Sequence, residues 1–492
     1  MIDSTKMETP LAGVADLSLE LPTDKPDNRY LTGSLGLVFA RTAVPIILVM
    51  LVNGLFTLVD AWFLGVYVGA EALTAVTLMF PLFMMLIAMA TIVSNGFSSV
   101  MARLLGAGAK SSVLGNAFAG AILLSLIFSG ILIAGFLSFG FNLVELVAKG
   151  SDTLALMGFT YIAILIVLSP ITFIEMLYFD LLRCEGRVAF MTAASLSTIL
   201  LNVLFNYVLI VEMDWGVAGS AYGTIAAQLT ALFAMIVYRF FARSTLSFDT
   251  LAFKVMRSHW RDYLALGVPP SLGYLGVSLS SAAIIYSLQL WSGDNYEATV
   301  GAYGITTRLM TFFFLPLLGL SMAFQTVLGN NFGAQYWARA DASVKLALVL
   351  SFFYCLAAEI FFLLFADVIA YGFVDDAAIA SETGRILPYM FLLFFLFGPT
   401  MMLASYFQAT GDAKRSAFMN LSRTYLFALP LTFALPFLLG ELGVWVAGPV
   451  AELLMLGMTV FLLVQVRRKQ KLHWGLFRHR ATSAVMNTVP QP

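Results

Sequence analysis

The stretch YFDLLRCEGRVAFM, residues 178–191, recurs in altered form as YFQATGDAKRSAFM, residues 406–419. Superposing the two aligns the same Tyr, Phe, Arg, Ala, Phe and Met. Two further pairs of segments repeat at almost the same separation: SNGFSSVMARLLGA from Ser94 with SMAFQTVLGNNFGA from Ser321, and GVAG from Gly216 with GVWVAG from Gly443. The chain is therefore predicted to contain two similar halves, related by an internal repeat.

The composition indicates the solvent in which these halves fold. Of the 492 residues, 60% are hydrophobic and 11% are charged, and the net charge is -1. The mean hydropathy is +0.90. Soluble domains carry about 25% charged residues, so this is the composition of a polytopic membrane protein, and no basic excess points to nucleic acid. Polar breaks leave about twelve runs long enough to cross a bilayer, near 38–66, 75–103, 112–140, 153–181, 188–211, 216–240, 262–291, 300–331, 341–366, 383–410, 416–440 and 443–466.

These runs predict an all-α integral membrane fold of about twelve transmembrane helices in two pseudo-symmetric bundles around a central cleft. The N-lobe is expected over 38–241 and the C-lobe over 262–466, joined by a cytoplasmic linker at 242–261. Because each bundle has an even number of helices, both enter the membrane in the same sense. The acidic segment 1–37 is expected to be a disordered tail, and 467–492 a basic tail.

The positive residues predict the orientation. The connections GAEAL, EMDWG, SGDNYEA and FVDDAA are acidic or neutral, whereas the alternate connections are basic. Cytoplasmic connections of membrane proteins carry the excess of Lys and Arg, so both termini are expected in the cytoplasm of a cell that carries this protein in its plasma or inner membrane. The residues on the basic side are Arg103, Lys110, Arg183, Arg187, Arg239, Arg243, Lys254, Arg257, Arg261, Arg339, Lys345, Lys414 and Arg415.

One carboxylate lies deep in the first apolar run. Asp60 lies within LFTLVDAWFLG, residues 55–65, and no Lys, Arg or His occurs from Thr42 to Ala102. A charged side chain at membrane depth costs a few kcal/mol, so such residues usually face a partner or a watery cavity. If two openings of a cleft solvate Asp60 differently, protonation biases the equilibrium between them. The alternative is a structural hydrogen bond within the bundle.

The order of these motifs resembles the multidrug and toxic compound extrusion (MATE) family of cation-coupled antiporters over about residues 38–466. Pro45 precedes Asp60 by fifteen residues, G-x-x-x-G-A-x-A-L-x-A-V follows from Gly65, and R-x-x-G-A-G begins at Arg103. LLRCEGR, LN-x-x-x-N-Y-x-L-I and GVAGSAYGT come next in that order. The resemblance implies two lobes, export of organic molecules and exchange for H+ or Na+.

Carried over residue by residue, the resemblance implies a cation-coupling site in the N-lobe at Asp60, Asn202, Asn206 and Thr224. Some members of the family carry a second aspartate at the position of Asn206, and its replacement here favours H+ over Na+. The segments PPSLGYLGVSLSSAAIIYS and YMFLLFFLFGPTMMLASYF lack the acidic residues of a C-lobe site. No other cofactor and no fixed metal site are expected.

Other polar residues within the spans carry weaker expectations. Pro45 frees a backbone carbonyl and permits helix 1 to bend on protonation, or else shapes only the start of that helix. Glu175 is a candidate contact for a proton or a cationic substrate, and Gln228 extends the polar face of Thr224. Asp180 is expected in a surface ion pair with Arg183. Four further charged residues leave their pairing open: Arg308, Glu359, Arg423 and Glu452.

We therefore expect a monomeric secondary transporter that exports lipophilic organic cations by alternating access. An enzyme is not expected, because His259, His473 and His479 lie outside the predicted spans and no nucleotide-binding motif occurs. A flippase for lipid-linked precursors is the main alternative, although a phosphate headgroup needs several basic residues in the cleft. A membrane receptor or scaffold without flux is the third. The abundance of Phe and Met suits both a polyspecific pocket and contact with membrane lipid.

Overall fold

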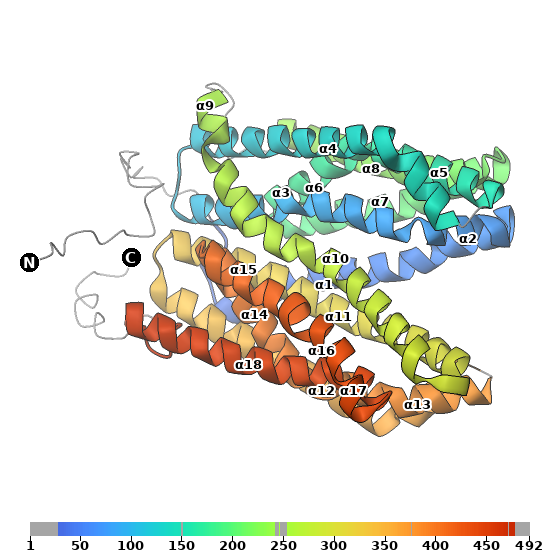
Figure 1. Cartoon of the computed structure of the whole chain (residues 1–492). Coiled ribbons are helices and arrows are strands. Elements are labelled where there is room, and N and C mark those ends of the chain that lie inside the picture. The colour runs from blue at the N-terminus through green and yellow to red at the C-terminus, as the bar shows by residue number, and fades with distance from the viewer. Residues whose placement is uncertain are drawn as a thin grey trace, which may run out of the picture.

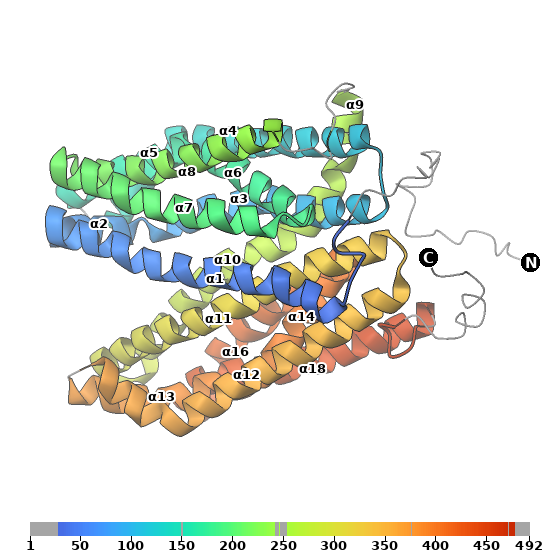
Figure 2. The ribbon, with the colours of Figure 1, turned by 180° about the vertical axis from the view of Figure 1, so that it is seen from behind.

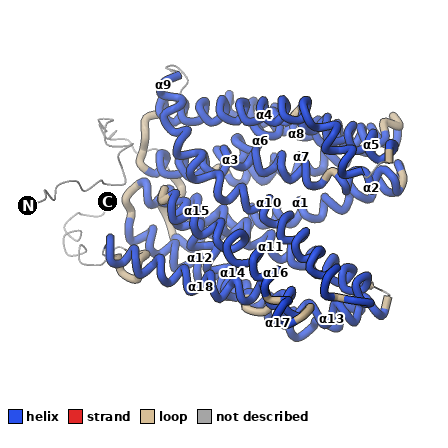
Figure 3. The backbone as a smooth tube through the Cα atoms, in the orientation of Figure 1, coloured by secondary structure: helices blue, strands red, loops and turns tan. Residues whose placement is uncertain are grey.

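The computed structural model describes residues 28–148, 151–241, 246, 253–374, 376–470 and 472–477. Helices make up nearly all of this part of the chain (Figure 3). The N-lobe contains α1 (Leu35–Phe63), η1 (Leu64–Val68), α2 (Ala70–Leu78), α3 (Phe80–Gly106), α4 (Ser111–Ala148), α5 (Asp152–Val167), α6 (Ser169–Cys184), α7 (Val188–Asn206), η2 (Tyr207–Glu212) and α8 (Gly216–Phe241).

The short α9 (Phe253–Met256) and η3 (Arg257–His259) lead into the second lobe. The C-lobe contains α10 (Trp260–Trp291), η4 (Gly293–Asn295), α11 (Tyr296–Gly333), α12 (Trp337–Phe373), α13 (Ala377–Phe391), α14 (Phe394–Thr410), α15 (Ala413–Leu421), η5 (Ser422–Ala428), α16 (Leu429–Ala434), α17 (Pro436–Leu439) and α18 (Leu442–Gln470). Half of the predicted linker, residues 242–245 and 247–252, lies outside the described residues.

The number of spans agrees with the prediction. Within the described residues, 10 helices are long and apolar enough to cross a membrane, or up to 12 if each of two bent helix pairs is one span. The pair α5 and α6 bends by 51° just before Pro170, whose ring cannot donate a backbone hydrogen bond. The pair α13 and α14 bends by 46° at Leu393, where φ is +65°. The predicted all-α membrane fold is confirmed.

The two lobes lie closest at one end of the molecule. Figures 1 and 2 show that α1 begins and α18 ends at the same end, which we call the terminal end, and that the lobes diverge away from it. Close backbone crossings hold them there. A Cβ added at Gly106 would lie 2.0 Å from the carbonyl oxygen of Asn330, and one at Gly333 would lie 2.1 Å from that of Arg103. Gly106 and Gly333 occupy the same position in the repeated segments, so the two crossings are related by the repeat.

The segment before α1 corrects the sequence prediction of a disordered tail over residues 1–37. Residues 1–27 lie outside the described part, but Asn28 to Ser34 form an ordered strap that leads into α1. The side chain of Tyr30 in this strap is 2% exposed. At the other end of the chain, α18 continues to Gln470, and Leu476 accepts a hydrogen bond from the Tyr406 hydroxyl at 3.2 Å.

Candidate functional site

The structure brings together the four residues of the predicted coupling site. Asn206 donates through Nδ2 to Oδ1 of Asp60 at 2.8 Å and to Oδ1 of Asn202 at 3.0 Å. Asn202 in turn donates to the Thr224 hydroxyl at 2.9 Å. Asn202 and Asn206 face the same way because they are one turn apart on α7. The result is a continuous hydrogen-bonded chain from α1 through α7 to α8.

Ser220 is a member of this site that the sequence analysis missed. Its hydroxyl donates to Oδ1 of Asp60 at 3.1 Å, and its backbone carbonyl accepts from the Thr224 hydroxyl at 3.1 Å. Helical spacing could have indicated Ser220, because it precedes Thr224 by one turn on the same face of α8. Asp60 thus accepts hydrogen bonds only from neutral groups within the described residues, and none of the ion pairs there includes it.

The site has spare acceptor capacity. The buried Oδ1 of Asn206 has no hydrogen-bond partner in the described structure. A carboxyl group beside an unpaired amide oxygen can hold a proton or contribute oxygen ligands to a small cation. No cluster of three or more His, Cys, Asp and Glu side chains suited to a metal ion occurs among the described residues. A sodium ion here would therefore bind to one carboxylate and neutral oxygens.

A cavity of about 420 Å³ opens next to this site. Its wall comes mainly from the N-lobe, and Tyr274 of α10 with Leu318 and Met322 of α11 adds the C-lobe side. Of the predicted site residues, Thr224, Gln228 and Glu175 line the cavity. Asp60, Asn202 and Asn206 are not part of its lining. Thr224 lines the cavity and accepts a hydrogen bond from Asn202, so it connects the cavity to the hydrogen-bonded chain that ends at Asp60.

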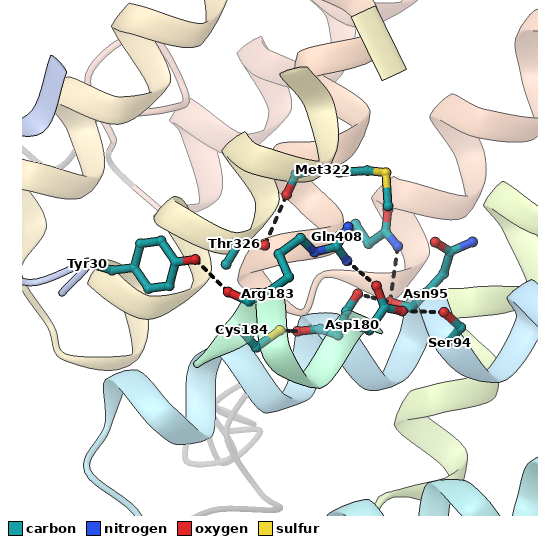
Figure 4. A network of polar contacts seen from close by, with 10 residues as sticks. Tyr30, Ser94, Asn95, Asp180, Arg183, Cys184, Met322, Thr326 and Gln408 are labelled. Carbon is teal, nitrogen blue, oxygen red and sulfur yellow. Dashed lines mark hydrogen bonds and ion pairs between the residues drawn. The ribbon is translucent and has the colours of Figure 1, made fainter. Parts of the chain in front are cut away.

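The predicted pair Asp180 and Arg183 exists, but its predicted location at the surface is wrong. The two side chains are 2.6 Å apart and only 8% and 3% exposed, and both line the cavity. The Ser94 hydroxyl donates a further hydrogen bond to Asp180. Figure 4 shows Arg183 between Asp180 on one side and Tyr30 on the other. The i,i+3 spacing predicts the pair correctly, but spacing carries no information on depth.

The repeat places Gln408 of the C-lobe at the position of Asp180. Gln408 donates through Nε2 to the carbonyl of Asn95 at 3.4 Å, one residue from the Ser94 that binds Asp180 (Figure 4). Its own carbonyl accepts from the Ser99 hydroxyl at 2.5 Å. The Arg103 guanidinium donates to the next carbonyl, that of Ala409, at 2.9 Å. Helix α3 therefore contacts the equivalent helices of both lobes.

The charged residues of the C-lobe adopt a different arrangement. Arg423 Nε lies 3.1 Å from Glu452 Oε1, and its guanidinium stacks 4.0 Å from the ring centre of Phe397. Glu359 instead accepts from the backbone N–H groups of Leu393 and Phe395 at 3.0 Å each. It thus provides hydrogen-bond acceptors for N–H groups at the break between α13 and α14. Arg308 forms no ion pair with any residue that the structure describes.

Comparison with known proteins agrees with this architecture. The model of the MatE family matches residues 45–208 and 269–434, which is more than half of the chain and covers both lobes. The chain belongs to the MATE family. A "Probable multidrug resistance protein YoeA" of Bacillus subtilis (strain 168) is 25% identical over 83% of this chain and 89% of that protein. The "Multidrug export protein MepA" of Staphylococcus haemolyticus (strain JCSC1435) is 23% identical over 87% of this chain and 93% of its own length.

Solved MATE structures share the fold. A structure described as the "Outward-facing conformation of a multidrug resistance MATE family transporter of the MOP superfamily" superposes with a TM-score of 0.79 at 23% identity, covering 90% of this chain and 98% of that one. A MATE solved in a "bent conformation" gives a TM-score of 0.78 with the same identity and coverage. This protein is accordingly a multi-pass membrane transporter of the multidrug efflux family.

Proposed function

We propose that this MATE protein exports lipophilic organic cations through the cell membrane in exchange for protons, which bind at Asp60. The observation that carries the proposal is that Asp60 is held by Asn206 and Ser220, both neutral donors. A carboxylate neutralised by a permanent basic partner has no need of an ion, whereas one held by neutral groups at membrane depth is stabilised by binding H+ or a cation.

Alternating access supplies the transport cycle. With both termini in the cytoplasm, the terminal end, where the lobes lie closest, faces the cytoplasm, and the lobes diverge toward the other side of the membrane (Figures 1 and 2). Protonation of Asp60 changes the hydrogen bonds that join α1, α7 and α8, and Pro45 within α1 gives that helix a point at which to bend. A ligand shifts such an equilibrium by its different affinity for the two states.

Sodium is the second candidate ion, favoured by the unpaired amide oxygen of Asn206. The flippase alternative is disfavoured because Arg183 is the one basic residue among the residues of the cavity lining, and Asp180 already pairs with it. A phosphate headgroup would need free basic donors.

The test is efflux of a fluorescent lipophilic cation from proteoliposomes, first under a pH gradient and then under a sodium gradient. The wild-type protein is expected to transport under the pH gradient, and Asp60→Asn is expected to stop this flux. Transport under the sodium gradient alone would change the assigned ion. No flux under either gradient would overturn the proposal and favour the flippase or a receptor without flux.

A further inference from the structure

The cavity contains a second carboxylate, and its surroundings point to a role separate from that of Asp60. Helix α6 begins after the bend at Leu168, so one face of it follows the cavity wall. The residues of this face that line the cavity are Thr172, Glu175, Met176, Phe179, Asp180 and Arg183. Their spacing of three to four residues is that of a single helical stripe. Glu175 lies in the middle of the stripe.

Glu175 is buried and incompletely satisfied. Its side chain is 4% exposed, and Oε1 has no hydrogen-bond partner in the described structure. Thr198 is in hydrogen-bonding contact with the carboxyl group, but its hydroxyl has one proton and also contacts the backbone carbonyl of Ala194 at 3.0 Å. Thr172 is likewise engaged, because its hydroxyl donates to Gln228 at 2.8 Å. A buried carboxylate oxygen without a donor is costly, and it indicates that a further partner belongs there.

The charge balance of the cavity defines that partner. Its ionisable carboxylates and guanidinium come from Glu175, Asp180 and Arg183. The last two neutralise each other at 2.6 Å. Glu175 is therefore the carboxyl group of the lining without a basic partner, and its ionised form supplies a single uncompensated negative charge, which matches a ligand with a single positive charge.

The other walls fit the rest of such a ligand. Phe83, Phe179 and Tyr274 present aromatic side chains to the cavity, and Met50, Met176 and Met322 present flexible thioethers. Aromatic rings attract organic cations, and methionine side chains adapt to ligands of different shape. Asp60, the carboxylate of the coupling site, does not line the cavity.

We propose that Glu175 binds the charged centre of a monovalent lipophilic cation in the cavity, while Asp60 binds the coupling ion at a separate site. This inference rests on the proposed function and assigns the substrate contact within it. Binding of the substrate at Glu175 and of the proton at Asp60 then influence each other through Gln228, Thr224 and the rest of α8 rather than by sharing one carboxylate.

Direct binding to the purified full-length protein tests this assignment. We would measure the Kd of tetraphenylphosphonium, a lipophilic monocation, and of an uncharged lipophilic dye for the wild type, Glu175→Gln, Asp60→Asn and Glu71→Gln. Glu71 is an exposed residue of α2 and controls for the loss of one charge elsewhere. Glu175→Gln is expected to weaken binding of the cation about tenfold or more, the loss of one charge-assisted contact. Binding of the uncharged dye by Glu175→Gln and binding of the cation by Glu71→Gln are expected to remain at the wild-type level. Because Asp60 influences the cation only indirectly, Asp60→Asn is expected to change the Kd of the cation less than Glu175→Gln does.

Two outcomes would overturn the assignment. Unchanged cation binding in Glu175→Gln, with the uncharged dye showing that the cavity is intact, would make Glu175 a structural residue. Weakened cation binding in Asp60→Asn but not in Glu175→Gln would show that substrate and coupling ion share Asp60. Because binding needs no ion gradient, this result is independent of the flux experiment that tests the proposed function itself.

A different observation carries a second inference, at the terminal end. The strap before α1 contacts both lobes at once: the Tyr30 hydroxyl donates to the carbonyl of Arg183 in the N-lobe at 2.5 Å, and Asn28 donates to Asn330 Oδ1 in the C-lobe at 2.8 Å. The carbonyl of Tyr30 accepts from Asn331 and from Arg339, each at 3.2 Å. Arg339 also donates to the carbonyl of Gly33 at 2.8 Å.

We infer that this strap is a latch that stabilises the state in which the lobes are closed at the terminal end. Opening of that end separates Arg183 from Asn331 and Arg339, so the strap must release one lobe for the cycle to proceed. Because Arg183 also lines the cavity, the latch contacts a residue of the cavity wall.

Distances between spin labels test the latch. The native Cys184 and Cys355 are both buried, so labels can be directed to Lys110→Cys and Lys414→Cys, two exposed positions on different lobes at this end. Tyr30→Phe, which keeps the ring, and Arg339→Met are expected to add a population with a longer distance. Arg29→Ala, an exposed neighbour, is the control and is expected to match the wild type. Unchanged distances in both variants, with binding of the uncharged dye retained, would overturn the latch.

Discussion

The two lobes share a repeat and a helical plan, yet apart from the buried Asp180–Arg183 pair of the N-lobe they hold their buried carboxylates in different ways. In the N-lobe, Asp60 accepts from Asn206 and Ser220, and Glu175 leaves one oxygen without a partner beside a cavity. In the C-lobe, Glu452 pairs with Arg423, and Glu359 binds two backbone N–H groups at a helix break. A carboxylate compensated by the protein contributes to stability, whereas one compensated by exchangeable ligands is suited to transport.

The largest expected effect on stability belongs to the C-lobe ion pair. Arg423→Met leaves Glu452 buried without its basic partner, and removal of one member of a buried pair typically costs about 3 to 5 kcal/mol. Thermal unfolding in detergent measures the loss. The double variant Arg423→Met with Glu452→Gln is expected to regain much of it, because no unpaired charge remains. Equal stability of the single variant and the wild type would show that the pair is not structural.

A smaller loss is expected at the helix break. Glu359→Gln keeps the shape of the side chain but leaves one neutral acceptor oxygen in place of two charged ones, so the N–H of either Leu393 or Phe395 loses its acceptor. We expect a loss of about 1 to 3 kcal/mol, the usual cost of an impaired hydrogen bond to a charged group. Transport per folded molecule is expected to change little. If coupling were lost while the fold was kept, Glu359 would belong to the transport site after all.

Ser220 provides a milder change within the coupling site. Ser220→Ala removes one neutral hydrogen bond to Asp60, worth about 0.5 to 1.5 kcal/mol. Because that hydrogen bond favours the charged carboxylate, its loss favours protonation, and the pH at which proton-driven flux is half-maximal is expected to move upward. Flux measured across a series of pH values gives this midpoint. Ser98→Ala, at a buried serine away from Asp60, is the control, and equal shifts in both variants would contradict a specific role of Ser220.

The smallest effect on stability is expected at Pro45, because α1 is continuous from Leu35 to Phe63 with this proline inside it. Pro45→Ala restores a backbone donor and favours a straight helix. The variant is expected to keep its fold and its binding of tetraphenylphosphonium but to lose turnover. Binding assays and flux assays on the same preparation separate the two, and normal turnover would remove helix bending from the account.

Sequence reasoning predicted most of the fold because membrane spans and an internal repeat can both be recognised in short segments of the sequence. The apolar runs predicted the helices, and the paired segments from Ser94 and Ser321 predicted two similar halves, whereas the close crossing of α3 and α11 was found in the structure. The coupling set of Asp60, Asn202, Asn206 and Thr224 came from the family resemblance, and helical spacing explains why the two asparagines face the same way.

Other features depended on how helices rotate and pack, which spacing does not encode. The partner of Arg423 was left open because any of several carboxylates lay at a suitable depth. Asp180 was placed at the surface, although the bend after Leu168 turns its helix face toward the cavity. The strap around Tyr30 was taken as disordered because a short polar segment shows no helical or strand periodicity, and its order comes from contacts with residues some 300 positions away.

The most direct test of the comparison is proton-driven efflux of a lipophilic cation by Asp60→Asn and by Arg423→Met with Glu452→Gln, reconstituted at equal amounts of folded protein. We expect Asp60→Asn to lose the flux and the C-lobe double variant to retain it. Loss of flux in the C-lobe variant together with normal flux in Asp60→Asn would contradict the account and place the coupling carboxylate in the C-lobe.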